Sequence, residues 1–187
     1  DDYVLPNGDD IVDALHFHRA MGQLSCGFYY VWDWPGDPDE EWMDARKMWG
    51  GACRQYLARY AREGCDSPFL VEDYVRKSQR PRELYQALMA WDEQREKDPP
   101  PTKAIWMDPS PVLFAVEWAR KQDRAFLWYT SRAVGDLLEA LGVPRFDSGK
   151  DTPDPNKHPV AALSTAVYNK GRNFQAWSKQ LVLEPVS

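Results

Sequence analysis

Two strand-like runs of the sequence end in hydroxyl side chains that could bind a phosphate. The first run, Ala125–Tyr129, is followed by Thr130, Ser131 and Arg132 where a helix is expected to start. Backbone N–H groups, the positive end of the helix dipole and a guanidinium can converge there on one anion. The same residues are also explained if Ser131 only caps the helix and Arg132 is solvated. Residue types alone leave both interpretations open.

The second run leads into a polar loop. Val160–Leu163 is expected to be a strand, and it is followed by Ser164, Thr165 and a stretch with glycine and amides over residues 166–175. Open parallel sheets bind their ligands at the carboxyl ends of strands, which is where this loop would lie. An ordinary strand-to-helix connection accounts for the composition equally well.

The spacing within these segments resembles a known family: the carboxy-terminal RecA-like lobe of superfamily 2 helicases, especially Swi/Snf-type translocases and helicase-like proteins of phages. Residues 163–165, five further residues and then 171–174 have the spacing of motif V, with Phe174 at a position that is usually leucine. Residues 126–132 resemble motif IV. The following segments, 145–149 and 181–185, resemble a strand with its glycine and the strand that leads to motif VI.

The resemblance implies a role for each matching residue. The implied contacts with the sugar-phosphate backbone of a nucleic acid, which carry no base readout, are Thr130, Ser131, Arg132, Ser164 and Thr165. The implied nucleotide-facing residues are Gly171, Asn173 and Gln175. Asn173 stands where many relatives place an acid that contacts the ribose, and an amide can act there only as a neutral hydrogen-bond partner. No catalytic residue is assigned.

The parts that would bind triphosphate and metal are missing from the sequence. It contains no G-x-x-x-x-G-K-[ST] loop and no D-E-x-[HD] pair after a strand, so the phosphate-binding lysine and the magnesium-binding acids must come from elsewhere. ATP and Mg²⁺ are therefore expected only in an intact motor, with the first RecA-like lobe as partner. The resemblance places motif VI beyond Ser187, so we expect a fragment that does not hydrolyse ATP alone.

Two alternatives from other classes stay open. The chain could be a non-catalytic, motor-derived module of a phage that binds protein or nucleic acid. It could also be an unrelated small α/β enzyme, which is disfavoured because no nucleophile and base pair is evident. A sequence that continues into an arginine-bearing motif VI would favour the motor over the module.

The expected fold class is α/β, with a RecA-like parallel sheet and flanking helices in residues 104–187. Further strands are expected at Val143–Phe146 and Gln180–Leu183, a helix at Ser131–Leu141, and a short loop without a helix after Gly149. Another helix is expected to start at Ser110, and its inward-facing residues are expected to be Val112, Leu113, Val116 and Ala119.

Residues 1–103 are expected to form a mostly helical, aromatic-rich insertion or brace. An extended segment at 25–36 should lead into a helix capped by Asp37 and ended by Gly64, and a second helix should span Pro81–Lys97. One face of the first helix carries an aromatic stripe. Such a stripe can stack bases, but at helical spacing it is typical of a core, and we favour the core interpretation.

The composition limits the remaining function classes. The net charge is −6, which excludes binding of nucleic acid by bulk positive charge, but residues 123–187 carry 8 Lys and Arg against 7 Asp and Glu. A local phosphate-binding surface is therefore possible there, with DNA favoured as the partner. Three scattered cysteines indicate neither a disulfide framework nor a zinc site, and no apolar run approaches the roughly 18 residues of a membrane span. We expect a cytoplasmic protein with no metal site and no membrane partner.

Overall fold

The computed structural model describes residues 5–7, 11, 14–60, 66–168 and 174–184. The chain divides into two compact units. Unit 1 consists of Asp1–Phe17 and Tyr30–Lys103, and unit 2 consists of His18–Tyr29 and Ala104–Ser187. The chain passes between the units within α1 (Ala14–Ser25), β1 (Phe28–Trp32) and β2 (Thr102–Trp106), and β1 and β2 pair in a two-stranded sheet. Helix α1 supplies unit 2 with its second half, so this unit contains a segment from the region before residue 104.

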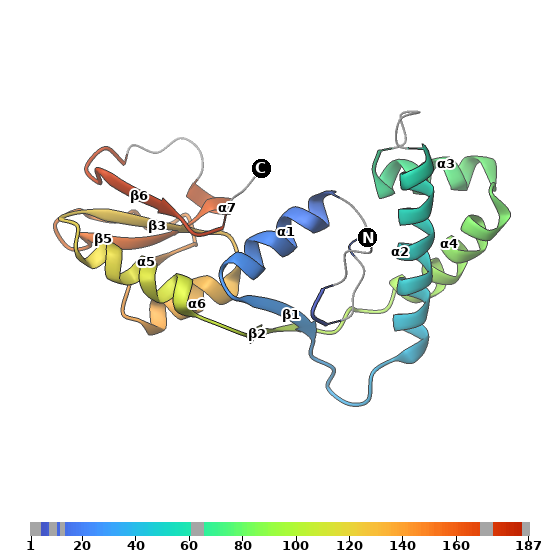
Figure 1. Cartoon of the computed structure of the whole chain (residues 1–187), viewed down its shortest axis with the longest axis horizontal. Coiled ribbons are helices and arrows are strands. Elements are labelled where there is room, and N and C mark those ends of the chain that lie inside the picture. The colour runs from blue at the N-terminus through green and yellow to red at the C-terminus, as the bar shows by residue number, and fades with distance from the viewer. Residues whose placement is uncertain (1–4, 8–10, 12–13, 61–65, 169–173, 185–187) are drawn as a thin grey trace. The chain divides into compact units, whose positions relative to one another are not determined.

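The helices of unit 1 are α2 (Glu40–Tyr60), α3 (Pro68–Ser78) and α4 (Arg82–Arg95), labelled in Figure 1. The cap of α2 is Asp39 and not Asp37 as expected, because the Asp39 carboxylate accepts the Trp42 N–H at 2.9 Å. That partner lies three residues on, which is the distance an N-cap side chain reaches. The expected end at Gly64 lies outside the described residues.

The core of unit 1 confirms the core interpretation of the aromatic stripe. Buried side chains of the three helices form one cluster, which consists of Trp49, Cys53, Leu57, Val71, Val75, Leu84, Ala87 and Leu88. Trp42 and Ala45 of the same stripe are also buried. Arg76 joins α3 to α4 on the surface, since its guanidinium lies 2.8 Å from Glu72 and 2.7 Å from Asp92.

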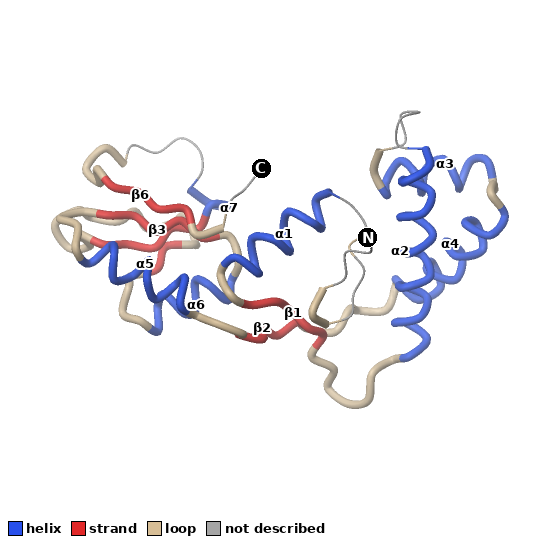
Figure 2. Tube along the Cα trace, in the orientation of Figure 1, coloured by secondary structure: helices blue, strands red, loops and turns tan. Residues whose placement is uncertain are grey.

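Unit 2 contains a four-stranded sheet with the order β4-β5-β3-β6, shown in red in Figure 2. Its strands are β3 (Ala125–Tyr129), β4 (Arg145–Phe146), β5 (Val160–Ser164) and β6 (Lys179–Val182). Every neighbouring pair is parallel. The expected α/β class with a parallel sheet is therefore confirmed, and the architecture is consistent with a RecA-like fold.

Both faces of the central strand β3 are covered, as its continuous apolar sequence requires. On one face, α5 (Ser110–Arg120) packs on β3 and α6 (Arg132–Ala140) packs on β5. The Tyr129 ring lies against Gly135 of α6, where an added Cβ would be 2.6 Å from a ring carbon. On the other face a buried cluster is formed by Phe126, Ala161, Leu163, Tyr168 and Trp177.

In helix α5, one of the residues predicted to face the core is wrong. Val112, Val116 and Ala119 are buried as expected, but Leu113 is 39% exposed and Ala115 is buried in its place. Positions 112, 115, 116 and 119 follow the spacing of a single helix face, and residue 113 lies about 100° away from it.

The connection from β4 to β5 is a loop without a helix, as expected. Two aromatic side chains hold it to the rest of unit 2. The Tyr168 hydroxyl, at the end of α7 (Thr165–Tyr168), donates to the Asp151 carbonyl at 2.6 Å, and the Trp177 indole N–H donates to the His158 carbonyl at 3.1 Å. None of the helices in the described part of the chain combines the length and the apolar surface needed to cross a bilayer.

Candidate phosphate-binding edge of the sheet

The carboxyl ends of β3 and β5 bring together two segments that are 35 residues apart in the sequence. Tyr129 pairs with Ser164 in the parallel register, so the next residues, Thr130 and Thr165, lie side by side. Their Oγ1 atoms are 2.9 Å apart, which is a hydrogen bond between the two hydroxyls. The residues that directly follow the two strands, Thr130 and Thr165, therefore form one continuous surface.

Arg132 adds a cation to this edge. Its side chain is 86% exposed at the first turn of α6, and its Nε atom lies 3.7 Å from a carboxylate oxygen of Asp136. An exposed ion pair of that length contributes little. The guanidinium can therefore turn toward an anion at small cost.

The start of α6 holds an anion that belongs to the chain itself. One carboxylate oxygen of Glu184 accepts the backbone N–H groups of Thr130 and Ser131, each at 2.7 Å, and the other oxygen accepts the Ser131 hydroxyl. Glu184 is only 3% exposed. A negative group at this position pairs with the N–H of the N-cap residue Ser131 and with that of Thr130 before it, and it interacts favourably with the helix dipole. The sequence analysis did not assign Glu184 to this site.

The five residues that are expected to contact the nucleic-acid backbone therefore differ in their surroundings. Thr130 and Arg132 are exposed and Thr165 is half-buried, so all three present surface to solvent. The Ser131 hydroxyl donates to Glu184, and Ser164 is buried, with 7% of its surface exposed. The surface that a phosphate can reach consists of Thr130, Thr165 and Arg132.

The expected nucleotide-facing residues are described only in part. Gly171 and Asn173 lie outside the described residues, whereas Gln175 is exposed and follows Phe174. Phe174 packs into the aromatic cluster, with its ring centroid 5.0 Å from that of Phe126 and 6.2 Å from that of Trp177. An aromatic side chain at this position thus anchors the loop that carries Gln175.

Comparison with family models, curated proteins and solved structures finds no match. Within the described ranges, no three His, Cys, Asp or Glu side chains are grouped so that they could hold a metal ion.

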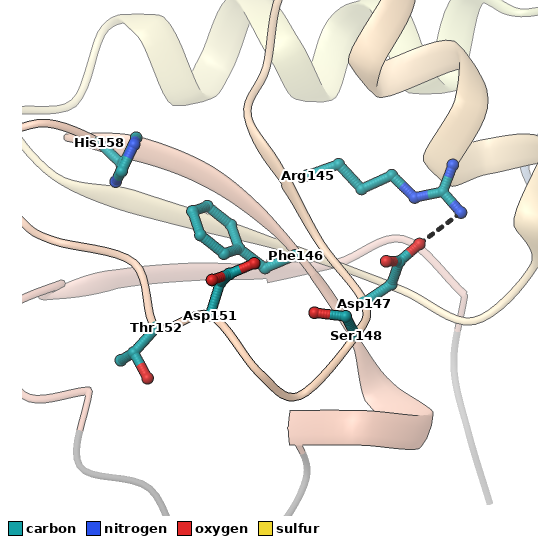
Figure 3. A pocket seen from close by; sticks show the side chains of 7 residues that line it. All are labelled: Arg145, Phe146, Asp147, Ser148, Asp151, Thr152 and His158. Carbon is teal, nitrogen blue, oxygen red and sulfur yellow. Dashed lines mark ion pairs between the residues drawn. The ribbon is translucent and has the colours of Figure 1, made fainter.

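A separate pocket of about 470 Å³ lies beside the β4–β5 connection. Figure 3 shows it, with the Arg145 guanidinium turned toward Asp147. That guanidinium is already engaged, because Nη2 lies 2.6 Å from Asp147, Nε donates to the Tyr129 hydroxyl at 3.0 Å, and Nη1 contacts Asp136. Asp151 adds a further negative charge to the lining. The pocket is therefore poorly suited to a phosphate, and the sheet edge is the better candidate.

Cys26 lies close to Glu184 in unit 2, and the charge of this carboxylate affects the pKa of the thiol. The thiol is 1% exposed and its Sγ–H donates to the Leu183 carbonyl at 3.4 Å. Burial, together with the nearby Glu184 carboxylate, raises the pKa of Cys26 to about 11, although a hydrogen bond with Ser25 opposes the shift. The protonated thiol is therefore the form that the folded unit stabilises.

We expect Cys26 to react slowly with iodoacetamide while unit 2 is folded. A pKa near 11 in place of 9.0 leaves about 100-fold less thiolate at pH 8, since only the thiolate reacts. Because the folded-state pKa is raised, this contribution to stability is complete below pH 9 and is lost as the pH rises toward 11. Labelling from pH 7 to 11, read by peptide mass spectrometry, checks the shift. Equal rates in native and urea-unfolded protein would contradict it.

Proposed function

We propose that this chain is the carboxy-terminal lobe of an ATP-dependent nucleic-acid helicase or translocase, and that it binds a phosphate backbone where β3 and β5 end. The supporting observation is the 2.9 Å contact between the hydroxyls of Thr130 and Thr165. It joins the two segments whose sequences separately resemble strand-binding motifs, and it does so at the sheet edge where ligands of parallel sheets bind.

The chemistry of this edge suits a phosphate and not a base. Two hydroxyls can donate to phosphate oxygens, and the Arg132 guanidinium can make a charge-assisted, bidentate contact. With no aromatic platform among these three side chains, the contact would carry no base preference. Binding should therefore be weak, sequence-independent and sensitive to salt.

In the intact motor, ATP and Mg²⁺ would lie between this lobe and the first RecA-like lobe, which would supply the phosphate-binding lysine and the metal-binding acids. Gly171, Asn173 and Gln175 of this chain would face that cleft. Movement of the two lobes against each other would then advance the strand, as in hinge-type domain motions. DNA is the favoured strand because the resemblance is to DNA-stimulated ATPases.

Strand binding is tested by fluorescence anisotropy of a labelled single-stranded oligodeoxynucleotide at about 50 mM salt, where phosphate contacts are strong. We expect Arg132→Ala to weaken binding about tenfold and to lower the slope of log K against log salt by about one. The double variant Thr130→Ala/Thr165→Ala should weaken binding by a similar factor, with the slope unchanged because no charge is lost.

The matched control is Arg82→Ala, which removes an exposed arginine at the start of α4 in unit 1. It has the same charge change as Arg132→Ala and should leave the affinity within about twofold of wild type. Absence of binding by the wild-type chain at low salt would refute strand binding. An equal loss in Arg82→Ala would show that only net charge matters.

A further inference from the structure

Glu184 lies next to the residues of the proposed phosphate contact. It follows β6, the edge strand beside β3, and the Leu183 N–H donates to the Trp128 carbonyl at 3.0 Å. Its carboxylate thus lies next to the end of β3. There it binds the N–H groups of Thr130 and Ser131, while the Thr130 side chain reaches the other way to Thr165.

The α1–β1 segment of unit 2 covers Glu184 and keeps it in place. A Cβ added to Gly22 would lie 3.7 Å from the Glu184 Cβ, and the Cys26 thiol donates to the carbonyl of Leu183. With 3% of its surface exposed, the carboxylate is bound to the turn and not to solvent. A phosphate could reach the two N–H groups only by displacing it.

We infer that Glu184 is a positioning residue: its carboxylate occupies the anion site at the start of α6 and thereby holds the Thr130 hydroxyl beside Thr165, where the pair meets the strand. This inference rests on the proposed function, since it concerns the same phosphate contact. Glu184 does not touch the strand. It acts through the backbone of Thr130, so the phosphate binds to the hydroxyls and Arg132, and the two N–H groups that Glu184 holds do not take part.

A double-mutant cycle separates this role from a general effect on stability. Glu184→Ala should weaken oligonucleotide binding about tenfold in the wild-type background, measured by anisotropy and corrected for the folded fraction by circular dichroism. In a Thr130→Ala background the same change should cost no more than about twofold, because interacting residues give non-additive effects. The Arg132→Ala background is the control. There Glu184→Ala should again weaken binding about tenfold, because we expect the contact between Arg132 and the phosphate to be independent of Glu184.

A conservative variant checks the hydrogen-bond geometry. In Glu184→Gln the amide oxygen can still accept both N–H groups, and the amide NH₂ can donate to the Ser131 hydroxyl. We expect affinity within about threefold of wild type. If Glu184→Ala does not fold, Glu184→Asp, which retains the charge but shortens the side chain, takes its place in the cycle and should show the same coupling to Thr130.

The possible results are distinct. Wild-type affinity in Glu184→Ala, or equal losses in the Thr130→Ala and Arg132→Ala backgrounds, would overturn the positioning role and leave the proposed function standing. Tighter binding by Glu184→Ala would also overturn it, because the nucleic-acid strand would then be using the vacated N–H groups. If the wild-type chain fails to bind the oligonucleotide, the proposed function fails and the positioning role falls with it.

Discussion

Replacing Phe126 with alanine is expected to lower the free energy of unfolding of unit 2 by about 3–5 kcal/mol. Phe126 lies in the central strand and is 0% exposed. Its ring stacks on that of Trp177 with the centroids 4.2 Å apart, and the Phe174 ring meets it edge-on at 5.0 Å. Removing the ring leaves a cavity beside the Trp177 and Phe174 rings. Urea unfolding followed by far-ultraviolet circular dichroism measures the loss.

The matched control for Phe126 is Phe114→Ala in α5 of the same unit. Phe114 is 68% exposed, so the same change in chemistry should alter the free energy of unfolding by no more than about 0.5 kcal/mol. Because a typical domain has about 5–15 kcal/mol in total, Phe126→Ala should leave unit 2 marginally stable. Similar midpoints for the two variants would show that the aromatic cluster is not the core of the unit.

Gly27→Ala is expected to be at least as damaging, by about 3 kcal/mol or more. Gly27 has a φ of +85°, and an added Cβ would lie 1.6 Å from the Asp108 carbonyl oxygen and 2.7 Å from its carbon. These are backbone atoms, so a side-chain rotation cannot relieve the clash. The Gly27 carbonyl also accepts the Met107 and Asp108 N–H groups at 2.8 and 3.0 Å. These two hydrogen bonds would be lost if the two segments of the chain moved apart.

Gly22→Ala serves as the comparison for Gly27→Ala. Gly22 lies within α1, five residues earlier in the same segment of unit 2, and its added Cβ would make an ordinary contact at 3.7 Å. Alanine is preferred to glycine inside a helix by about 0.5–1 kcal/mol, so this variant should be slightly more stable than wild type. Equal unfolding free energies for Gly27→Ala and wild type would contradict the close approach of Gly27 to Asp108.

The sheet of unit 2 was predictable because its two inner strands, β3 and β5, are short apolar runs. The expected strand Ala125–Tyr129 is confirmed with both of its ends. Helix α3 was not predicted, because Phe69 and Tyr74 are exposed and blur the amphipathic pattern. Strand β2 was not predicted either. It follows three prolines and is stabilised by pairing with β1, a partner that no local pattern reveals.

The site was predictable where it depends on residue type and unpredictable where it depends on topology. Hydroxyls at the ends of Ala125–Tyr129 and Val160–Leu163 were evident, and the parallel pairing of β3 with β5 brings Thr130 to Thr165. The role of Glu184 requires the knowledge that β6 lies beside β3. An acid directly after the short apolar run 181–183 was the available signal, but it has no meaning until the neighbour of β6 is known.

The hydrogen bond from Cys26 to Leu183 joins residues that are 157 positions apart, which has a consequence for the order of events on the ribosome. The segment that covers Glu184 is synthesised well before its partner, which follows it by more than 150 residues. Helices α2, α3 and α4 find one another across short connections and can assemble early in the nascent chain. Unit 2 must instead wait for β6, so α1 is synthesised long before the surface against which it packs.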